Sequence, residues 1–247
     1  MSISVSPTVA GRVIDPVRLR RYDRVFYTGM SLLMLAIVFV GFSPTFYSRA
    51  PGAQPELYSL SIVHGIVFSC WMVLFAAQTS LVAARRTSVH RRLGVLGACL
   101  AAVVVALGFA MGVTAAKLGN GPPGVDPKAF VATPLFDMLV LGPLFATAIY
   151  YRRAPEMHKR LMLIGTISML GAALARMSFG RQYGPLFFFG VTDLLLLMGV
   201  IFDKVTRGQV HKAYVVGGLA LVISQPLRLF VGRTEAWHRF IDVLIRA

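Results

Sequence analysis

The sequence is dominated by apolar segments that are about as long as a membrane-spanning helix. Seven of them lie at residues 26–46, 58–83, 93–115, 130–150, 160–178, 185–202 and 212–231. A helix needs about 20 apolar residues to cross the hydrocarbon core of a bilayer. Of the 247 residues, 56% are hydrophobic and 14% are charged, which excludes a sizeable soluble catalytic domain. The sequence therefore predicts an all-α integral membrane protein built as a bundle of seven transmembrane helices.

Basic residues are distributed unevenly between the two sides of these segments. Sixteen of the 25 Lys and Arg residues lie in residues 1–28 and in the turns near 84–92, 151–160 and 203–212. Because Lys and Arg concentrate in cytoplasmic loops, we expect a cytoplasmic N-terminus and, with seven spans, an external C-terminus. The net charge of +15 is then explained by topology and by attraction to anionic membrane lipid, and it does not indicate nucleic-acid binding.

The chain divides into three parts on these grounds. Residues 1–25 form a cytoplasmic basic segment, residues 26–231 form the seven-helix transmembrane domain, and residues 232–247 form a tail. In the tail, apolar residues recur at helical spacing with charges between them, at Trp237, Phe240, Ile241, Leu244 and Ile245. This pattern predicts an amphipathic helix at the outer membrane surface.

One helix start occurs three times along the chain. RRTSVHRRLGVLG at 85–97 and RRAPEMHKRLMLIG at 152–165 share two Arg, a His, two basic residues and a Leu, and VHKAYVVGG at 210–218 is a weaker copy. These copies place His90, His158 and His211 at the starts of spans three, five and seven. The repeat predicts one lone helix followed by three helical hairpins.

The helix starts H-R-R-L-G and H-K-R-L-M, together with HGIVFSCWMVLFAAQT at 64–79, resemble a family of uncharacterised bacterial multi-pass membrane proteins over residues 58–178. This resemblance implies a bacterial inner membrane and no particular reaction. The same starts are similar to those of cytochrome b561-type electron carriers, in which paired histidines on different helices hold b-type haem. That similarity implies His90, His158 and His211 as haem ligands.

Two other interpretations of these histidines remain open. They are expected at the membrane edge, where they would also serve as interfacial anchors beside Arg and Lys, or as pH sensors or partner contacts on the cytoplasmic side. With His64 near the opposite edge, the sequence predicts no pair of histidines at matched depth within the bilayer.

Several polar side chains lie inside the predicted spans. Their depths from the outer ends are about 9–12 Å for His64, Asp137 and Asp193, at roughly 1.5 Å per residue. Arg176, Gln225 and Arg228 lie near the outer ends of spans five and seven. Each ionisable group inside a span costs about 2.5–3.5 kcal/mol, so each needs a partner or a function. The sequence predicts that these groups converge in the outer half of the bundle.

Span two adds a further side to this predicted site. His64, Trp71 and Gln78 recur every seven residues and so lie close to one helix face. This shared face predicts that span two forms one wall of a pocket inside the bundle. The complete predicted set of ligand-binding residues is His64, Trp71, Asp137, Arg176, Asp193, Gln225 and Arg228.

Three functions are compatible with these patterns. The outer-half pocket indicates binding or transport of a small polar or anionic ligand, or of protons. The histidines indicate a b-type haem redox protein, with haem as a possible cofactor. Alternatively, the charges are purely structural ion pairs in a packing or signalling protein. No metal site is expected, because His64 and the two Asp residues come from separate helices without local ligand spacing, and no catalytic motif is present. Whether the chain is an enzyme, its ligand and its oligomeric state stay open.

Overall fold

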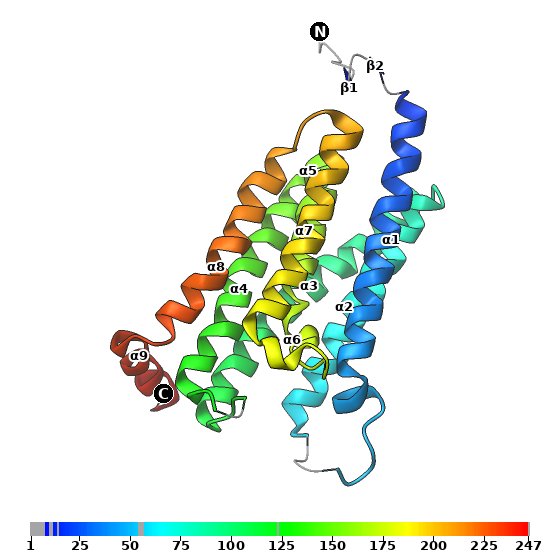
Figure 1. Cartoon of the computed structure of the whole chain (residues 1–247). Helices are drawn as coiled ribbons and strands as arrows, with labels where there is room; N and C mark the ends of the chain where they lie inside the picture. The colour runs from blue at the N-terminus through cyan, green and yellow to red at the C-terminus, as the bar shows by residue number, and fades with distance from the viewer. Residues whose placement is uncertain (1–7, 10–11, 14, 54–56, 123, 247) are drawn as a thin grey trace.

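The structure is a computed structural model that describes residues 8–9, 12–13, 15–53, 57–122 and 124–246. Among these residues, six helices are long and apolar enough to cross a membrane, so the chain is a polytopic helical membrane protein. They are α1 (Pro16–Phe42), α2 (Ser59–Ala83), α3 (Thr87–Lys117), α4 (Pro127–Tyr150), α7 (Pro185–Arg207) and α8 (Leu219–Val231), which follows the π-helical turn η4 (Tyr214–Gly218). Figure 1 shows them as an elongated bundle.

The segment expected as the fifth span, residues 160–178, is divided. It contributes to α5 (Pro155–Ser168) and to the four-residue α6 (Gly171–Leu174), and neither is as long as the six apolar helices. Helix α5 lies inside the bundle, where Leu163, Ile164 and Ile167 have no exposed surface. Together α5 and α6 return the chain from the end where α4 finishes to the end where α7 begins (Figure 1).

Short elements complete the described chain. Near the N-terminus, Thr8 pairs with Val13 in the antiparallel strands β1 (Thr8–Val9) and β2 (Arg12–Val13). The remaining turns are the π-helical η1 (Ser43–Tyr47) and the 3-10 turns η2 (Tyr151–Arg153) and η3 (Arg181–Tyr183). We call the end of the bundle that holds the starts of α1, α3 and α5 and the α7–α8 turn the basic end, and the opposite end the α9 end.

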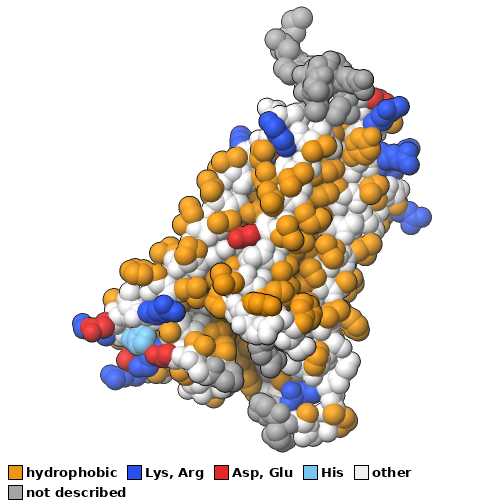
Figure 2. Space-filling view, in the orientation of Figure 1, with side chains coloured by type: hydrophobic (Ala, Val, Ile, Leu, Met, Phe, Trp, Pro, Cys, Tyr) orange, Lys and Arg blue, Asp and Glu red, His pale blue; other side chains and the backbone are white. Residues whose placement is uncertain are grey.

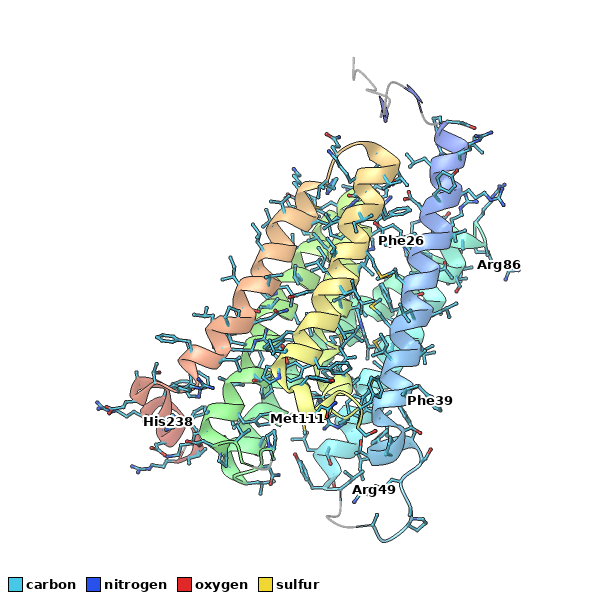
Figure 3. The ribbon with its side chains drawn as sticks, in the orientation of Figure 1. Phe26, Phe39, Arg49, Arg86, Met111 and His238 are labelled. Carbon is cyan, nitrogen blue, oxygen red and sulfur yellow. The ribbon has the colours of Figure 1, made fainter. Side chains whose placement is uncertain are left out.

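The surface separates charge from hydrophobicity along the bundle axis. On the face drawn in Figure 2, hydrophobic side chains cover the flank, and charged side chains gather toward the two ends. Figure 3 places Arg86, in the turn between α2 and α3, and His238, on α9 (Glu235–Arg246), at opposite ends. This distribution is the one expected of a bundle whose flank contacts lipid.

Two helices begin with the same pair of residues, Asp followed by Pro. Asp15 accepts a hydrogen bond from the backbone N–H of Val17 at 2.9 Å at the start of α1. Asp126 accepts one from the backbone N–H of Lys128 at 2.8 Å at the start of α4. The carboxylate satisfies an N–H that has no partner within the helix, and Pro at the first helical position needs none. These caps fix where α1 and α4 begin.

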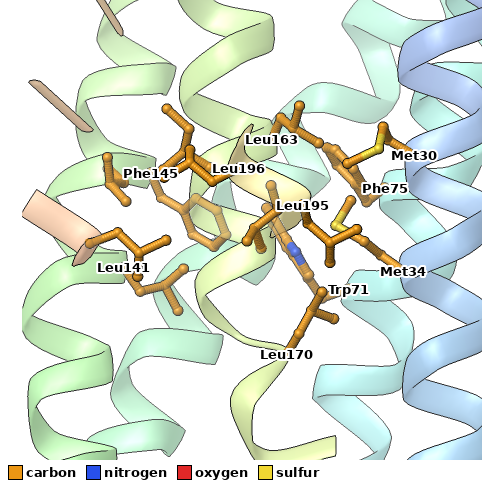
Figure 4. Packing of buried hydrophobic residues seen from close by; sticks show 14 of the residues in the cluster. Met30, Met34, Trp71, Phe75, Leu141, Phe145, Leu163, Leu170, Leu195 and Leu196 are labelled. Carbon is orange, nitrogen blue, oxygen red and sulfur yellow. The ribbon is translucent and has the colours of Figure 1, made fainter. Parts of the chain in front are cut away.

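The core of the bundle is assembled around α5 (Figure 4). Trp71 of α2, expected to line an outer pocket, is 3% exposed and packs in this core. Its ring lies 4.3 Å from the ring of Phe145, and its indole N–H donates to the hydroxyl of Thr166 at 3.4 Å. Trp71 therefore joins α2 to α4 and α5, which is a packing role.

A buried ion pair joins α5 to α7 at the basic end. Arg160 and Asp203 have no exposed side-chain surface, and Arg160 donates to both carboxylate oxygens, at 2.7 and 2.5 Å. Arg160 also donates to the backbone oxygen and the carboxylate of Glu156, each at 2.7 Å. Such a bidentate pair satisfies both charges inside a low-dielectric interior.

Helix α1 joins the same group of charges. Asp23 accepts hydrogen bonds from Lys159 at 2.8 Å and from Arg207 at 2.6 Å. The six side chains, which we call the ion-pair network, carry three positive and three negative charges and connect α1, α5 and α7: Asp23, Glu156, Lys159, Arg160, Asp203 and Arg207. In the sequence alone, the Lys and Arg among them indicate topology and attraction to anionic lipid.

Replacing Asp203 with Asn tests the importance of this network. The substitution leaves the Arg160 guanidinium buried without its counter-charge, and breaking a buried pair costs about 3–5 kcal/mol. We expect the Tm of the purified protein in detergent to fall sharply. The exposed pair formed by Arg239 and Glu235 on α9 provides the control, because Arg239→Ala should leave the Tm nearly unchanged. Equal effects of the two changes would contradict a structural role for the network.

Helix α1 also makes a close contact at the α9 end. A methyl group added at Gly41 would collide with the backbone carbonyl of Ala173 in α6, whereas one added at Gly29 would meet nothing within 4 Å. A backbone carbonyl cannot move aside as a flexible side chain can. We therefore expect Gly41→Ala to lower the Tm and Gly29→Ala, in the same helix, to maintain or raise it. A thermal scan of both variants measures the difference, and matched Tm values would mean that α1 and α6 do not approach so closely.

Helix α9 packs against the start of α4. Ile241 is fully buried against Val131 and Leu135 of α4. The Trp237 indole N–H donates to the backbone oxygen of Lys128 at 2.8 Å, and Lys128 forms a 2.6 Å salt bridge with Asp242. The predicted apolar stripe thus covers the start of α4, and its place at the outer membrane surface stays a prediction.

Candidate functional site

The predicted outer-half residues do not form one cluster in the structure. They separate into a pair between α4 and α8, a pair between α7 and α8, and two residues that contact aromatic rings of α1 and α2. Trp71 packs in the core, as described above. The three groups have different partners and are described in turn.

The first group is a buried ion pair between α4 and α8. Arg228 is 2% exposed, and its guanidinium donates to the carboxylate of Asp137. It also donates to the backbone oxygen of Ser224 at 3.1 Å and to the Ser224 hydroxyl at 2.7 Å, and it lies 5.6 Å from the ring centre of Phe189. Both charges are therefore partnered within the protein.

The second group lies beside the first along α8. The side-chain amide of Gln225 donates to the carboxylate of Asp193 on α7 at 2.7 Å. Gln225 is buried, at 5% exposure, and Asp193 is half-buried. An amide hydrogen bond orients a carboxyl group without neutralising a negative charge, so this pair differs from the pair of Asp137 and Arg228.

His64 and Arg176 form the third group. The ring of His64 stacks on Phe68 at 3.9 Å, and its buried Nδ1 has no hydrogen-bond partner among the described residues. The guanidinium of Arg176 lies 4.6 Å from the ring centre of Phe42 and donates to the backbone oxygen of Ala172 at 2.8 Å. The described contacts of these two residues are therefore with aromatic rings and with the backbone.

Two surface grooves lie elsewhere on the described structure. One, of about 510 Å³, is open and is lined by Phe46, Tyr47, Ile66, Ser69, Cys70, Val73, Leu74 and Ala77. The other, of about 320 Å³, lies between α1 and α7 and is lined by Phe26, Met198, Ile201, Phe202 and Val205. Neither includes any of the seven predicted ligand-binding residues.

A double-mutant cycle tests whether Asp137 and Arg228 act as one structural unit. Asp137→Ala leaves a buried guanidinium alone and should destabilise the protein by about 3–5 kcal/mol. Adding Arg228→Met removes the stranded charge, so the double variant should recover part of that loss. Equilibrium unfolding of the four proteins measures the coupling. Additive effects would show that the two side chains do not depend on each other.

Two of the three histidines at the repeated helix starts lie close together in the structure. His90, in the first turn of α3, and His158, in the first turn of α5, lie with ring centres 6.4 Å apart and ring planes at 78°. Both rings are half-buried at the basic end. The sequence predicts no pair of histidines at matched depth within the bilayer, whereas the structure brings His90 and His158 together, edge to face, at the basic end.

Hydrogen bonds orient the two rings. His158 Nδ1 lies 2.8 Å from the backbone oxygen of Ala148. A carbonyl only accepts hydrogen bonds, so Nδ1 carries the proton and the Nε2 lone pair of neutral His158 remains free. The Gln78 amide lies 2.7 Å from His90 Nδ1, in the orientation that also satisfies the His90 carbonyl and the Gly94 N–H. Gln78, recognised in the sequence only as part of the α2 face, is therefore a neighbour of His90.

The third copy of the repeat does not join this pair. The backbone N–H of His211 donates to Asp203 at 3.2 Å, and His211 Nδ1 accepts from the backbone N–H of Ala213 at 3.1 Å. Burial lowers the pKa of His211, and the positive charge of Arg160 lowers it further. His211 thus belongs beside the ion-pair network, where it stays neutral at physiological pH.

Comparison with known protein families, with curated proteins and with solved structures finds no match to this chain.

Proposed function

We propose that this chain is a membrane redox protein that binds b-type haem between His90 and His158. The observation that carries the proposal is the approach of these two rings, which come from equivalent positions of an internal repeat on two different helices. The similarity of the helix starts to those of cytochrome b561-type carriers supports the same conclusion.

The separation of the rings suits a shared metal ion. Two imidazole nitrogens, each about 2.0–2.1 Å from one metal, place the ring centres about 6 Å apart once the ring radii are added. The observed 6.4 Å agrees with this distance. His158 already presents a free Nε2, because its Nδ1 is held by Ala148. A hydrogen bond donated by the other nitrogen is the usual support of a metal-binding histidine, and His158 makes one. His90 Nδ1 accepts from the Gln78 amide, so Gln78 would have to turn its side-chain oxygen toward Nδ1 before Nε2 of His90 could bind iron.

The side chains available as further ligands, and the Arg residues near the histidine pair, favour haem over a bare metal ion. The described residues contain no group of three or more His, Cys, Asp or Glu side chains placed to hold a metal. Haem brings four nitrogen ligands of its own and needs two from the protein, and it supplies one-electron chemistry when bound. The exposed guanidinium groups of Arg91, Arg92, Arg152 and Arg153 would attract its carboxylates and repel a free divalent cation.

The proposal includes a topology. The basic end faces the cytoplasm of a bacterial inner membrane, where its Lys and Arg contact anionic lipid headgroups. The bundle crosses the bilayer seven times as one helix and three hairpins, with α5 and α6 as a broken fifth crossing that is shielded from lipid by its neighbours. His90 and His158 then lie at the cytoplasmic edge, within reach of soluble electron donors.

Ligand binding or transport in the outer half stays a prediction. Its residues satisfy one another in separate groups, and neither groove described above includes them, so the histidine pair has the stronger geometric support. The structural interpretation of the charges is best supported at Asp137 and Arg228, where both partners lie within the protein.

Absorption spectroscopy of the protein expressed with haem supplementation tests the proposal. We expect a Soret band in the wild type and its loss, or a large decrease in haem content, in His90→Ala and His158→Ala, because each would remove one of the two histidines that hold the haem. The matched controls are His211→Ala, the third copy of the repeat, and His64→Ala at the other end. Both should retain the spectrum.

Two results would overturn the proposal. The first is a wild-type protein that stays colourless after supplementation while it remains folded by circular dichroism. The second is a haem spectrum that survives both substitutions of the pair.

A further inference from the structure

The two histidines of the pair are oriented by different kinds of group. His158 Nδ1 lies 2.8 Å from the backbone oxygen of Ala148, and a carbonyl oxygen only accepts hydrogen bonds. His90 Nδ1 lies 2.7 Å from the side-chain amide of Gln78 on α2, and an amide offers either an oxygen or an NH2 group. The orientation of this one amide therefore decides which nitrogen of a neutral His90 ring carries the proton.

Two further contacts fix the orientation of the Gln78 amide. With its NH2 group toward His90, the amide donates to Nδ1 at 2.7 Å and to the His90 backbone oxygen at 3.2 Å, and its oxygen accepts from the Gly94 N–H at 3.1 Å. The opposite orientation would place the amide oxygen against the His90 carbonyl and the NH2 group against the Gly94 N–H. It would lose both of these hydrogen bonds even if Nδ1 carried a proton, so the first orientation is the more stable one.

We propose that Gln78 is a positioning residue that holds neutral His90 with its proton on Nε2. A ring nitrogen that accepts a hydrogen bond carries a lone pair, so the proton of a neutral imidazole lies on the other nitrogen. His158 has the reverse arrangement, with its proton on Nδ1 and a free lone pair on Nε2. Equivalent positions of the repeat therefore hold opposite tautomers.

The consequence of this asymmetry for haem binding rests on the proposed function. A ligand to iron must offer a lone pair, so the His90 proton must leave Nε2 and a proton must bind Nδ1 through exchange with water. The Gln78 amide must also turn its oxygen toward Nδ1, which breaks its hydrogen bonds to the His90 carbonyl and the Gly94 N–H. His158 needs neither change. Gln78 therefore weakens haem binding at His90 and makes the two sides of the site unequal.

NMR of the haem-free, full-length protein in nanodiscs, with isotope-labelled histidine, tests the proposal. Neutral imidazole predominates in mildly alkaline buffer, and long-range proton–nitrogen correlation spectra show which ring nitrogen carries the proton. The spectra of His90→Ala and His158→Ala assign the signals. We expect the wild-type proton on Nε2 of His90 and on Nδ1 of His158. A neutral His90 with its proton on Nδ1 would overturn the proposal without recourse to any variant at Gln78.

Gln78→Glu provides the matched variant, because a carboxylate has nearly the shape of the amide but only accepts hydrogen bonds. We expect Nδ1 of His90 to be protonated in this variant, while the tautomer of His158 stays unchanged. Gln78→Leu, which can neither donate nor accept, should leave His90 in a mixture of tautomers. If Nδ1 of His90 stays unprotonated in Gln78→Glu, the amide has a structural role only.

Haem titration of the wild type and Gln78→Glu separates this proposal from the proposed function. We expect the variant to bind haem about tenfold more tightly, because partners of metal-binding histidines change metal affinity by about 10–100-fold. Equal affinities would show that Gln78 does not control His90, and would overturn this inference alone. If neither protein binds haem, the proposed function fails, and the NMR spectra still decide whether Gln78 selects the tautomer of His90.

Discussion

The buried salt bridge between Arg160 and Asp203 is the contact on which the basic end of the bundle depends. Neither side chain touches solvent, and Arg160 reaches both oxygens of Asp203 as well as Glu156. Two charges removed from water remain stable only when their geometry is good and their other hydrogen bonds are made, and both conditions hold here. The pair fixes the first turns of α5 against α7. Because His158 lies two residues before Arg160, the same contact sets its position.

The internal repeat explains why two histidines meet at this end. Each copy turns the chain after a helix that runs toward the basic end and starts the next helix with a His followed by basic residues. In the first two copies the rings meet edge to face, and Ala148 and Gln78 form hydrogen bonds with them. In the third copy the backbone N–H of His211 donates to Asp203 instead. The same sequence pattern therefore makes different contacts in different copies, depending on how the helices pack.

Hydropathy was sufficient to predict six of the helices because each is long, apolar and exposed to lipid along one side. It was not sufficient for residues 160–178, because a buried helix and a spanning helix have the same composition. The division into α5 and α6 and the role of α5 as the centre of the core depend on contacts such as that between Gly165 and the ring of Phe145. These contacts join residues far apart in the sequence.

The candidate sites show the same limit. Depth along a helix can be read from the sequence, and it places Asp137, Asp193, Gln225 and Arg228 in the predicted outer half, where the structure joins them in two pairs. The contacts of the other two residues depend on packing, which places His64 against Phe68 and Arg176 against Phe42. The ion-pair network could have been predicted from Glu156 and Asp203, which are acidic residues among the basic residues at 151–160 and 203–212.

The central claim is that His90 and His158 share one haem iron, and electron paramagnetic resonance of the oxidised protein tests it most directly. If both imidazoles hold the iron, the oxidised protein would give a low-spin ferric signal. A high-spin ferric signal, which indicates fewer than two strong axial ligands, or the absence of any haem signal from haem-supplemented protein would contradict the account.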